Sequence, residues 1–166
     1  MMKTEEHKIA LSIYPNTYGF GYSVAENFKE LIDYGVVKIS PISNKKCLKR
    51  FIEFIEFYNP KIIVLRDYEK NKSIRSKRLA KLFEQMISLA EKKKLEISNY
   101  TREDIKNVFS QFNSHTKHQI CKTIVKWYPQ LRRRMPKVRK AWETESYSMS
   151  YFDAISLFIT HLYLSN

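Results

Sequence analysis

The sequence predicts an α/β protein built on a mixed five-stranded β-sheet flanked by helices. Three observations lead to this fold class: the first 40 residues have strand composition, the middle of the chain alternates between helical and strand periods, and the remainder is helical. The 166 residues are the length of one domain, and no repeat, low-complexity tract or linker divides them. We therefore expect residues 1–166 to form a single domain.

The N-terminal region has the pattern of an antiparallel sheet. Branched and aromatic residues dominate residues 8–14, 18–25 and 36–40, and a Pro-Asn-Thr turn at residues 15–17 separates the first two stretches. All three glycines of the chain also fall in its first 35 residues, where hairpins need backbone freedom. We expect three strands over these ranges.

Helical and strand periods alternate in the middle of the chain. Apolar residues recur at helical spacing over residues 44–58, and Pro60 ends that helix. Residues 61–67 carry a continuous apolar run, typical of a strand that is buried on both faces of a partly parallel sheet. A second helix is expected over residues 73–93 and a fifth, short strand over residues 95–98.

The C-terminal third is predicted to be helical. Thr101 followed by Asp104 resembles a capping box that opens a short helix, and a longer helix is expected over about residues 114–127. Two prolines then bracket a basic loop over residues 129–136. Ser150 is expected to cap a last helix that runs to about residue 164.

The charge balance points to an acidic partner. The chain has 30 Lys and Arg against 17 Asp and Glu, a formal net charge of +13, which is more than solubility requires. Nucleic acid is the leading partner for such a chain. Because 43% of the residues are hydrophobic and 14% aromatic, the composition excludes a disordered polycation and predicts a folded protein.

The cysteines and the apolar segments indicate the cellular compartment of the protein and whether it has a zinc site or a membrane span. Cys47 and Cys121 form no pair with disulfide-framework or zinc-ribbon spacing, so a reducing, intracellular and cytoplasmic location is expected. His115, His118 and Cys121 are three residues apart, but no fourth zinc ligand is visible. No signal peptide or membrane span is expected.

A basic segment is the clearest chemical signal in the sequence. Nine basic residues and no acid stand between positions 117 and 140: Lys117, Lys122, Lys126, Arg132, Arg133, Arg134, Lys137, Arg139 and Lys140. Trp127, Tyr128 and Trp142 flank this segment and are candidates to stack on bases or on arginine planes. A second basic cluster consists of Lys70, Lys72, Arg75, Lys77, Arg78 and Lys81. Such clusters favour phosphate binding over a merely solvated surface.

The order of elements is that of the RNase H fold, and two segments resemble a specific family of that fold. Residues 13–24, with the sequence IYPNTYGFGYSV, look like the first hairpin of RuvC-type Holliday junction resolvases. Residues 152–155 and 159–161, FDAI and ITH, are similar to that family's last helix. The segments around Lys106 and Lys117 resemble places where such resolvases have DNA-contacting lysines, so the resemblance adds Lys106 to the candidate contacts.

The resemblance implies a site that this sequence only partly retains. Resolvases of this type hold two magnesium ions with acids from the first strand, the fourth strand and the last helix. Here Tyr14, Arg66 and Ser150 occupy three of those positions, with Asp67 next to Arg66, and Asp153 alone matches. Since tyrosine is neutral and arginine is cationic, the family's mechanism is expected to fail as the sequence stands.

Two interpretations of the remaining acids stay open. Asp153, Asp67 and Glu145, with Glu69 and Glu143, are candidates for a rearranged catalytic set that would bind Mg²⁺ or Mn²⁺, with Asp153 as a metal ligand. However, Asp67 follows Arg66 directly and is expected on the opposite face of the strand. Asp153 would also have a purely structural role if Ser150 were the N-cap and Asp153 the N3 residue.

The sequence thus predicts a RuvC-like protein that binds branched or duplex nucleic acid, with DNA favoured, and whose nuclease site is degenerate. The first alternative is a metal-dependent, structure-selective endonuclease that uses the rearranged acids. The second is a basic scaffold subunit of a protein or ribonucleoprotein complex. The resemblance also implies a homodimer, and membership of a larger complex stays open.

Overall fold

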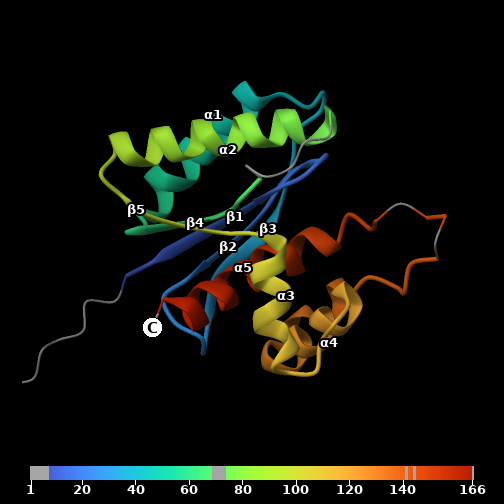
Figure 1. Cartoon of the computed structure of the whole chain (residues 1–166). Coiled ribbons are helices and arrows are strands. Elements are labelled where there is room, and N and C mark those ends of the chain that lie inside the picture. Colours follow the sequence, from blue (N-terminus) through green and yellow to red (C-terminus); the bar gives the residue numbers. More distant parts are fainter. Residues whose placement is uncertain (1–7, 69–73, 141, 144, 166) are drawn as a thin grey trace, which may run out of the picture.

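A mixed five-stranded sheet forms the centre of the molecule (Figure 1). The computed structural model describes residues 8–68, 74–140, 142–143 and 145–165. The strand order is β3-β2-β1-β4-β5. β1 pairs antiparallel with β2, β2 antiparallel with β3, and β4 lies parallel to both β1 and β5. The strands are β1 Ala10–Pro15, β2 Gly19–Ala25, β3 Leu31–Lys38, β4 Ile62–Arg66 and β5 Glu96–Tyr100. This architecture confirms the predicted fold class.

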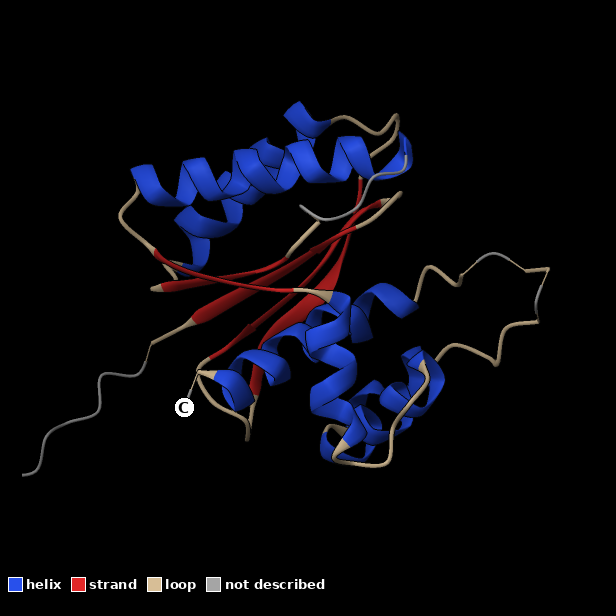
Figure 2. Ribbon diagram, viewed as in Figure 1, coloured by secondary structure: helices blue, strands red, loops and turns tan. Residues whose placement is uncertain are grey.

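Helices cover both faces of the sheet (Figure 2). One face is covered by α1 Asn44–Tyr58 and α2 Ile74–Lys92, and the other by α5 Met149–Leu164. On the outer side of α5 lie α3 Arg102–Ser110 and α4 Lys117–Trp127. Because α5 lies between the sheet and these two helices, its residues 152–161 are buried all round, which explains why apolar residues occur on every side of that helix.

Each face of the sheet has its own hydrophobic core, and alternate side chains of β1 pack into one core or the other. Leu11 and Ile13 pack toward α1 and α2, whereas Ala10 and Tyr14 pack toward α5. On the neighbouring strand, Gly21 lets α5 approach closely, since a Cβ there would lie 2.1 Å from the Ser150 carbonyl oxygen. The start of α5 is therefore held directly against the hairpin of β1 and β2.

Three predicted elements differ from the structure by more than two residues or in type. β3 begins at Leu31 rather than at residue 36, because Tyr34 and Gly35 pair with β2 instead of forming a turn. α4 begins at Lys117 rather than at residue 114, because the Thr116 side chain caps the helix by accepting from the Gln119 N–H, and the Thr116 N–H in turn donates to the Gln119 side chain. The expected basic loop is mostly a 3₁₀-helix, η1 Pro129–Arg134.

The expected cap of the last helix is also wrong. α5 begins at Met149, and Ser150 already lies within its first turn. The preceding residue, Ser148, makes no side-chain capping bond. Asp153 therefore lies one turn inside the helix and is not the N3 partner of a Ser150 cap.

Candidate functional site

Four sequence-predicted residues meet where the parallel strands β1 and β4 end beside the first turns of α5. Tyr14 is on β1, Arg66 on β4, and Ser150 and Asp153 are on α5. The Arg66 guanidinium lies over two rings, 5.1 Å from the centroid of Tyr14 and 4.0 Å from that of Tyr68. We call Tyr14, Arg66, Tyr68, Asp153 and Lys117 the central cluster.

The tyrosines of the central cluster keep Arg66 in a largely apolar setting. Burial raises the pKa of the Tyr14 phenol well above its usual range, with a further contribution from the Asp153 carboxylate, and burial likewise raises the pKa of Tyr68. The Tyr68 hydroxyl donates to the Pro15 carbonyl oxygen. The buried Nε of Arg66 has no hydrogen-bond partner among the described atoms. A cation flanked by two neutral phenols thus stands at this edge of the sheet.

Asp153 is 4% exposed, and its carboxylate is paired with a lysine. Lys117 Nζ lies 3.6 Å from Asp153 Oδ1 and donates to both carboxylate oxygens of Glu145, at 2.9 and 3.0 Å. Burial raises the pKa of Asp153, the Lys117 ammonium opposes that rise, and Glu145 adds to it. Two of the candidate acids, Asp153 and Glu145, are therefore brought together by an ammonium group.

Ser150 joins the start of α5 to the β1–β2 turn. Asn16 Nδ2 donates to Ser150 Oγ at 2.8 Å, and Asn16 Oδ1 accepts from the backbone N–H groups of Tyr18 and Gly19 at 2.9 and 3.1 Å. This arrangement satisfies the buried hydroxyl of Ser150 and fixes the turn. Asn16 was not among the predicted site residues, although its place in a turn is a signal for such a role.

The other candidate acids do not join Asp153 and Glu145. Because Arg66 and Tyr68 lie on the α5 face of β4, alternation places Asp67 on the other face, and its N–H continues the ladder to the Tyr100 carbonyl at 2.8 Å. Glu143 is exposed between η1 and α5, and Glu69 lies outside the described residues. Within the described ranges, no three His, Cys, Asp or Glu side chains are close enough to hold a metal ion.

The donor chemistry of the central cluster therefore does not fit Mg²⁺ or Mn²⁺. These hard dications need several oxygen ligands, whereas the cluster offers the Asp153 carboxylate and the adjoining Glu145, which already share Lys117. Arg66 adds a second positive charge beside them. The zinc trio does not form either: His115 precedes α4, and the buried Cys121 thiol lies 3.5 Å from the sulfur of Met149.

A second candidate surface carries exposed cations. We call the following eight residues of α4, η1 and the segment after them the basic surface: Lys122, Lys126, Arg132, Arg133, Arg134, Lys137, Arg139 and Lys140. All eight are exposed, and none forms an ion pair with another described residue. They lie on the side of the sheet that α5 covers, away from α1 and α2 (Figure 1). Lys106 is exposed on α3.

Two of the three flanking aromatic residues are unavailable for stacking on bases. Trp127 packs edge-on against Phe28 and Phe112, at centroid distances of 5.2 and 5.0 Å. Tyr128 is buried, and its hydroxyl donates to the Phe28 carbonyl oxygen. Trp142 alone of the three is exposed, and Lys140 Nζ lies 5.4 Å from its ring centroid.

The second basic cluster is partly structural. The Arg78 guanidinium donates to Asn44 Oδ1 at 3.0 Å and to the Asn16 carbonyl oxygen at 2.8 Å, so it ties α2 to α1 and to the β1–β2 turn. Lys77 and Lys81 lie on α2. Lys70 and Lys72, and the side chain of Arg75, lie outside the described residues.

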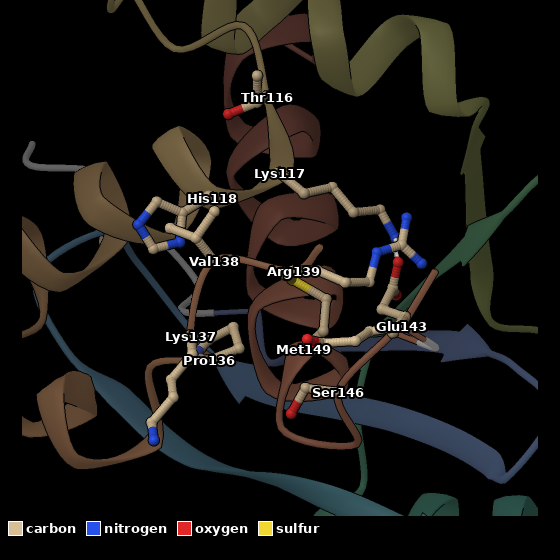
Figure 3. A pocket seen from close by; sticks show the side chains of 11 residues that line it. Thr116, Lys117, His118, Pro136, Lys137, Val138, Arg139, Glu143, Ser146 and Met149 are labelled. Carbon is tan, nitrogen blue, oxygen red and sulfur yellow. Dashed lines mark hydrogen bonds and ion pairs between the residues drawn. The ribbon is translucent and has the colours of Figure 1, made fainter. Parts of the chain in front are cut away.

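A groove of about 550 Å³ lies between the start of α4 and the segment that precedes α5. Its lining combines three cations, Lys117, Lys137 and Arg139, with Glu143 and Glu145. Figure 3 shows Lys117 and Arg139 extending toward the same side of the groove. The groove thus connects the central cluster with the basic surface.

Comparison with known proteins identifies the fold. No protein-family model and no curated protein sequence matches the chain. The solved structure described as T. thermophilus RuvC in complex with Holliday junction substrate is similar, with a TM-score of 0.67 and 15% identity over 96% of this chain and 95% of that one. The Thermus thermophilus RuvC structure has a TM-score of 0.62 and 16% identity over 95% of each chain. The fold is therefore RuvC-like. Over its described residues, the protein has no helix long and apolar enough to span a bilayer.

Proposed function

We propose that this protein binds nucleic acid, with duplex or branched DNA as the favoured form, through the basic surface. The observation that carries the proposal is the set of eight exposed cations on α4, η1 and the segment after it, none paired with a described acid. Phosphates would supply the missing negative charges and release counterions. The similar RuvC structure with a Holliday junction substrate supports branched DNA as a ligand.

The same proposal gives the central cluster a role other than metal-dependent strand cleavage. Lys117 holds Asp153 and Glu145, and Arg66 lies beside them, so a dication would have to displace one cation and approach another. The cluster would then join β1, β4 and α5 without a metal. Mg²⁺ or Mn²⁺ enters only in the alternative, a nuclease with a rearranged set of acids. In this proposal residues 1–166 act as one domain.

Binding and its salt dependence test the proposal. Titrations of a labelled four-way DNA junction and of a labelled duplex should give log K against log salt slopes of about −5 if six phosphates are contacted. In the variant Lys126→Ala, Arg132→Ala, Arg133→Ala the slope should become less steep by about 3. Arg134 is left intact because its guanidinium lies 5.2 Å from the Tyr151 ring centroid.

The control triple variant is Lys45→Ala, Lys46→Ala, Lys49→Ala, which removes the same charge from exposed positions of α1 on the other face of the sheet. Its slope should stay within 1 of the wild type. Equal slopes for both triple variants would contradict the assigned surface. The same samples, with Mg²⁺ or Mn²⁺, are resolved on a denaturing gel. Intact strands are expected; nicks that Asp153→Ala abolishes would establish the nuclease instead. A salt-sensitive protein complex that DNA cannot displace would favour the scaffold alternative.

A further inference from the structure

We propose that Trp142 is a stacking site for an unpaired base, so that single strands and branched DNA gain a contact that fully paired duplex does not make. This inference rests on the proposed function and adds a ligand class to it. The site consists of the Trp142 ring and the basic residues Lys137, Arg139 and Lys140 that precede it.

The exposure of Trp142 is the first observation. The side chain is 80% exposed, in the segment between η1 and α5. A ring of this size in the fold's interior would bury some 150–250 Å² of surface, and leaving it in water forfeits that stabilisation. A large aromatic side chain in solvent is therefore a candidate contact for a partner.

The charges around the ring indicate what kind of partner fits. Lys140 lies over the ring with its Nζ 5.4 Å from the centroid, and Arg139 and Lys137 are exposed beside it in the sequence. Single-strand binding sites combine such cations, which hold the backbone phosphates, with an aromatic face on which the bases stack. Lys140 lies over one face of the Trp142 ring, and most of the side chain is in solvent. The other face is therefore open for a base to stack on.

Phe57 shows why exposure alone does not make such a site. It is also 80% exposed, but it lies near the end of α1, on the face of the sheet opposite the basic surface. The five residues before Phe57 include two acids, Glu53 and Glu56, and no Lys or Arg. The five before Trp142 include three cations, and one acid, Glu143, follows the ring. Trp142 and Phe57 therefore form a matched pair of equally exposed rings in opposite electrostatic settings.

Accessible bases distinguish the preferred ligand from plain duplex. In a continuous duplex each base face is covered by its neighbours, and opening a step costs a few kcal/mol. Ends, branch points and single strands present a base face at much lower cost. We therefore expect Trp142 to contribute to binding of single strands and branched DNA and to contribute little to binding of duplex.

The experiment compares three labelled probes at one salt concentration: an oligo-dT, a relaxed circular DNA duplex that has neither ends nor unpaired loops, and a four-way junction. Trp142→Ala should weaken oligo-dT binding about 10-fold and junction binding somewhat less, with duplex binding changed less than 2-fold. Trp142→Phe should restore most of the loss, because phenylalanine also offers a stacking face. Phe57→Ala is the control and should leave all three affinities unchanged.

A fluorescence measurement gives an independent readout. Oligo-dT should quench the wild-type emission, and the quenching should disappear in Trp142→Phe, whose remaining tryptophan is the packed Trp127. Equal losses on all three probes in Trp142→Ala, or no loss on any, would overturn the stacking site. If duplex binding and its salt slope persist in that case, the proposed function stands and this inference alone fails. Absence of binding to every probe would overturn both.

Discussion

The central cluster and the basic surface both contain cations, but those of the cluster are paired or enclosed by other side chains and those of the surface are exposed. Lys117 lies within 3.6 Å of one carboxylate and hydrogen-bonds a second, and Arg66 lies between two buried tyrosine rings. The cations of the basic surface are exposed and have no described acid as a partner. The paired charges of the central cluster contribute to the stability of the fold. The unpaired charges of the basic surface make favourable ionic interactions only when an acidic ligand binds.

This contrast separates two residues that the sequence treats alike. Lys117 and Lys126 are both lysines of the basic segment and both lie on α4. Their environments differ because α4 begins at Lys117, next to α5 and to Glu145, whereas Lys126 lies in the last turn and is exposed. A count of positive charges therefore overstates the surface available to nucleic acid, and the contacts of each side chain decide which charges remain.

The largest expected effect is that of Lys117→Ala on stability. Removing the ammonium leaves Asp153 buried without its partner, and we expect a loss of about 3 kcal/mol in the free energy of unfolding, measured by urea denaturation at pH 7. Lys126→Ala, on the same helix but exposed, should change it by less than about 0.5 kcal/mol.

Adding Asp153→Asn to Lys117→Ala sharpens the contrast. Because the uncompensated carboxylate is then gone, most of the lost stability should return. Equal effects of Lys117→Ala and Lys126→Ala would break the distinction between the central cluster and the basic surface.

Arg66→Met should have a smaller effect. The guanidinium contributes about 2 kcal/mol by lying over two rings in a desolvated setting, and its unpaired Nε offsets part of that. We expect a net loss of about 1 kcal/mol in thermal or urea unfolding. The matched control is Arg50→Met, since Arg50 lies 5.7 Å from the Phe54 ring but is half exposed. A stabilised Arg66→Met would mean that the buried guanidinium costs the fold more than it contributes.

The smallest effect is a pH dependence of stability that involves Asp153. Burial raises its folded-state pKa above the ordinary value of 3.8, so the ionised carboxylate destabilises the fold relative to the protonated form. That cost is fully present above the raised pKa and is relieved as the pH falls through it toward 3.8. The stability of the wild type relative to Asp153→Asn should therefore increase over this acidic range.

Urea denaturation at several pH values measures this difference, with Glu56→Gln, at an exposed position of α1, as the control for a solvated carboxylate. A difference between wild type and Asp153→Asn that stays constant with pH would show that Asp153 titrates alike in the folded and unfolded states.

Much of the fold follows from local sequence patterns. The element boundaries that were predicted wrongly show where tertiary contacts outweigh those patterns. The helical stripe over residues 44–58 and the apolar run of β4 correspond to α1 and to a central parallel strand. The sequence pattern predicts a start of β3 at residue 36, five residues later than the observed start at Leu31. In the folded protein Gly35 lies opposite Tyr22, and pairing with β2 outweighs the local preference.

Local sequence patterns also fail to predict which aromatic residues are free to stack on bases. From the sequence, Trp127, Tyr128 and Trp142 are equivalent aromatic neighbours of a basic segment. Trp127 and Tyr128 pack with Phe28, a residue about 100 positions away in the sequence, and only Trp142 stays in solvent. No local signal distinguishes the three, because burial depends on which distant segment covers a side chain.

The sequence by itself determined the element order, the fold class, the excess of positive charge and the replacement of acids by Tyr14, Arg66 and Ser150. The tertiary structure decided what those replacements do: parallel β1 and β4 and the start of α5 bring Arg66 between two tyrosines and Lys117 onto Asp153 and Glu145. The physical reason is that composition and periodicity are properties of neighbours along the chain, whereas the pairing and burial of a charge depend on residues from distant segments.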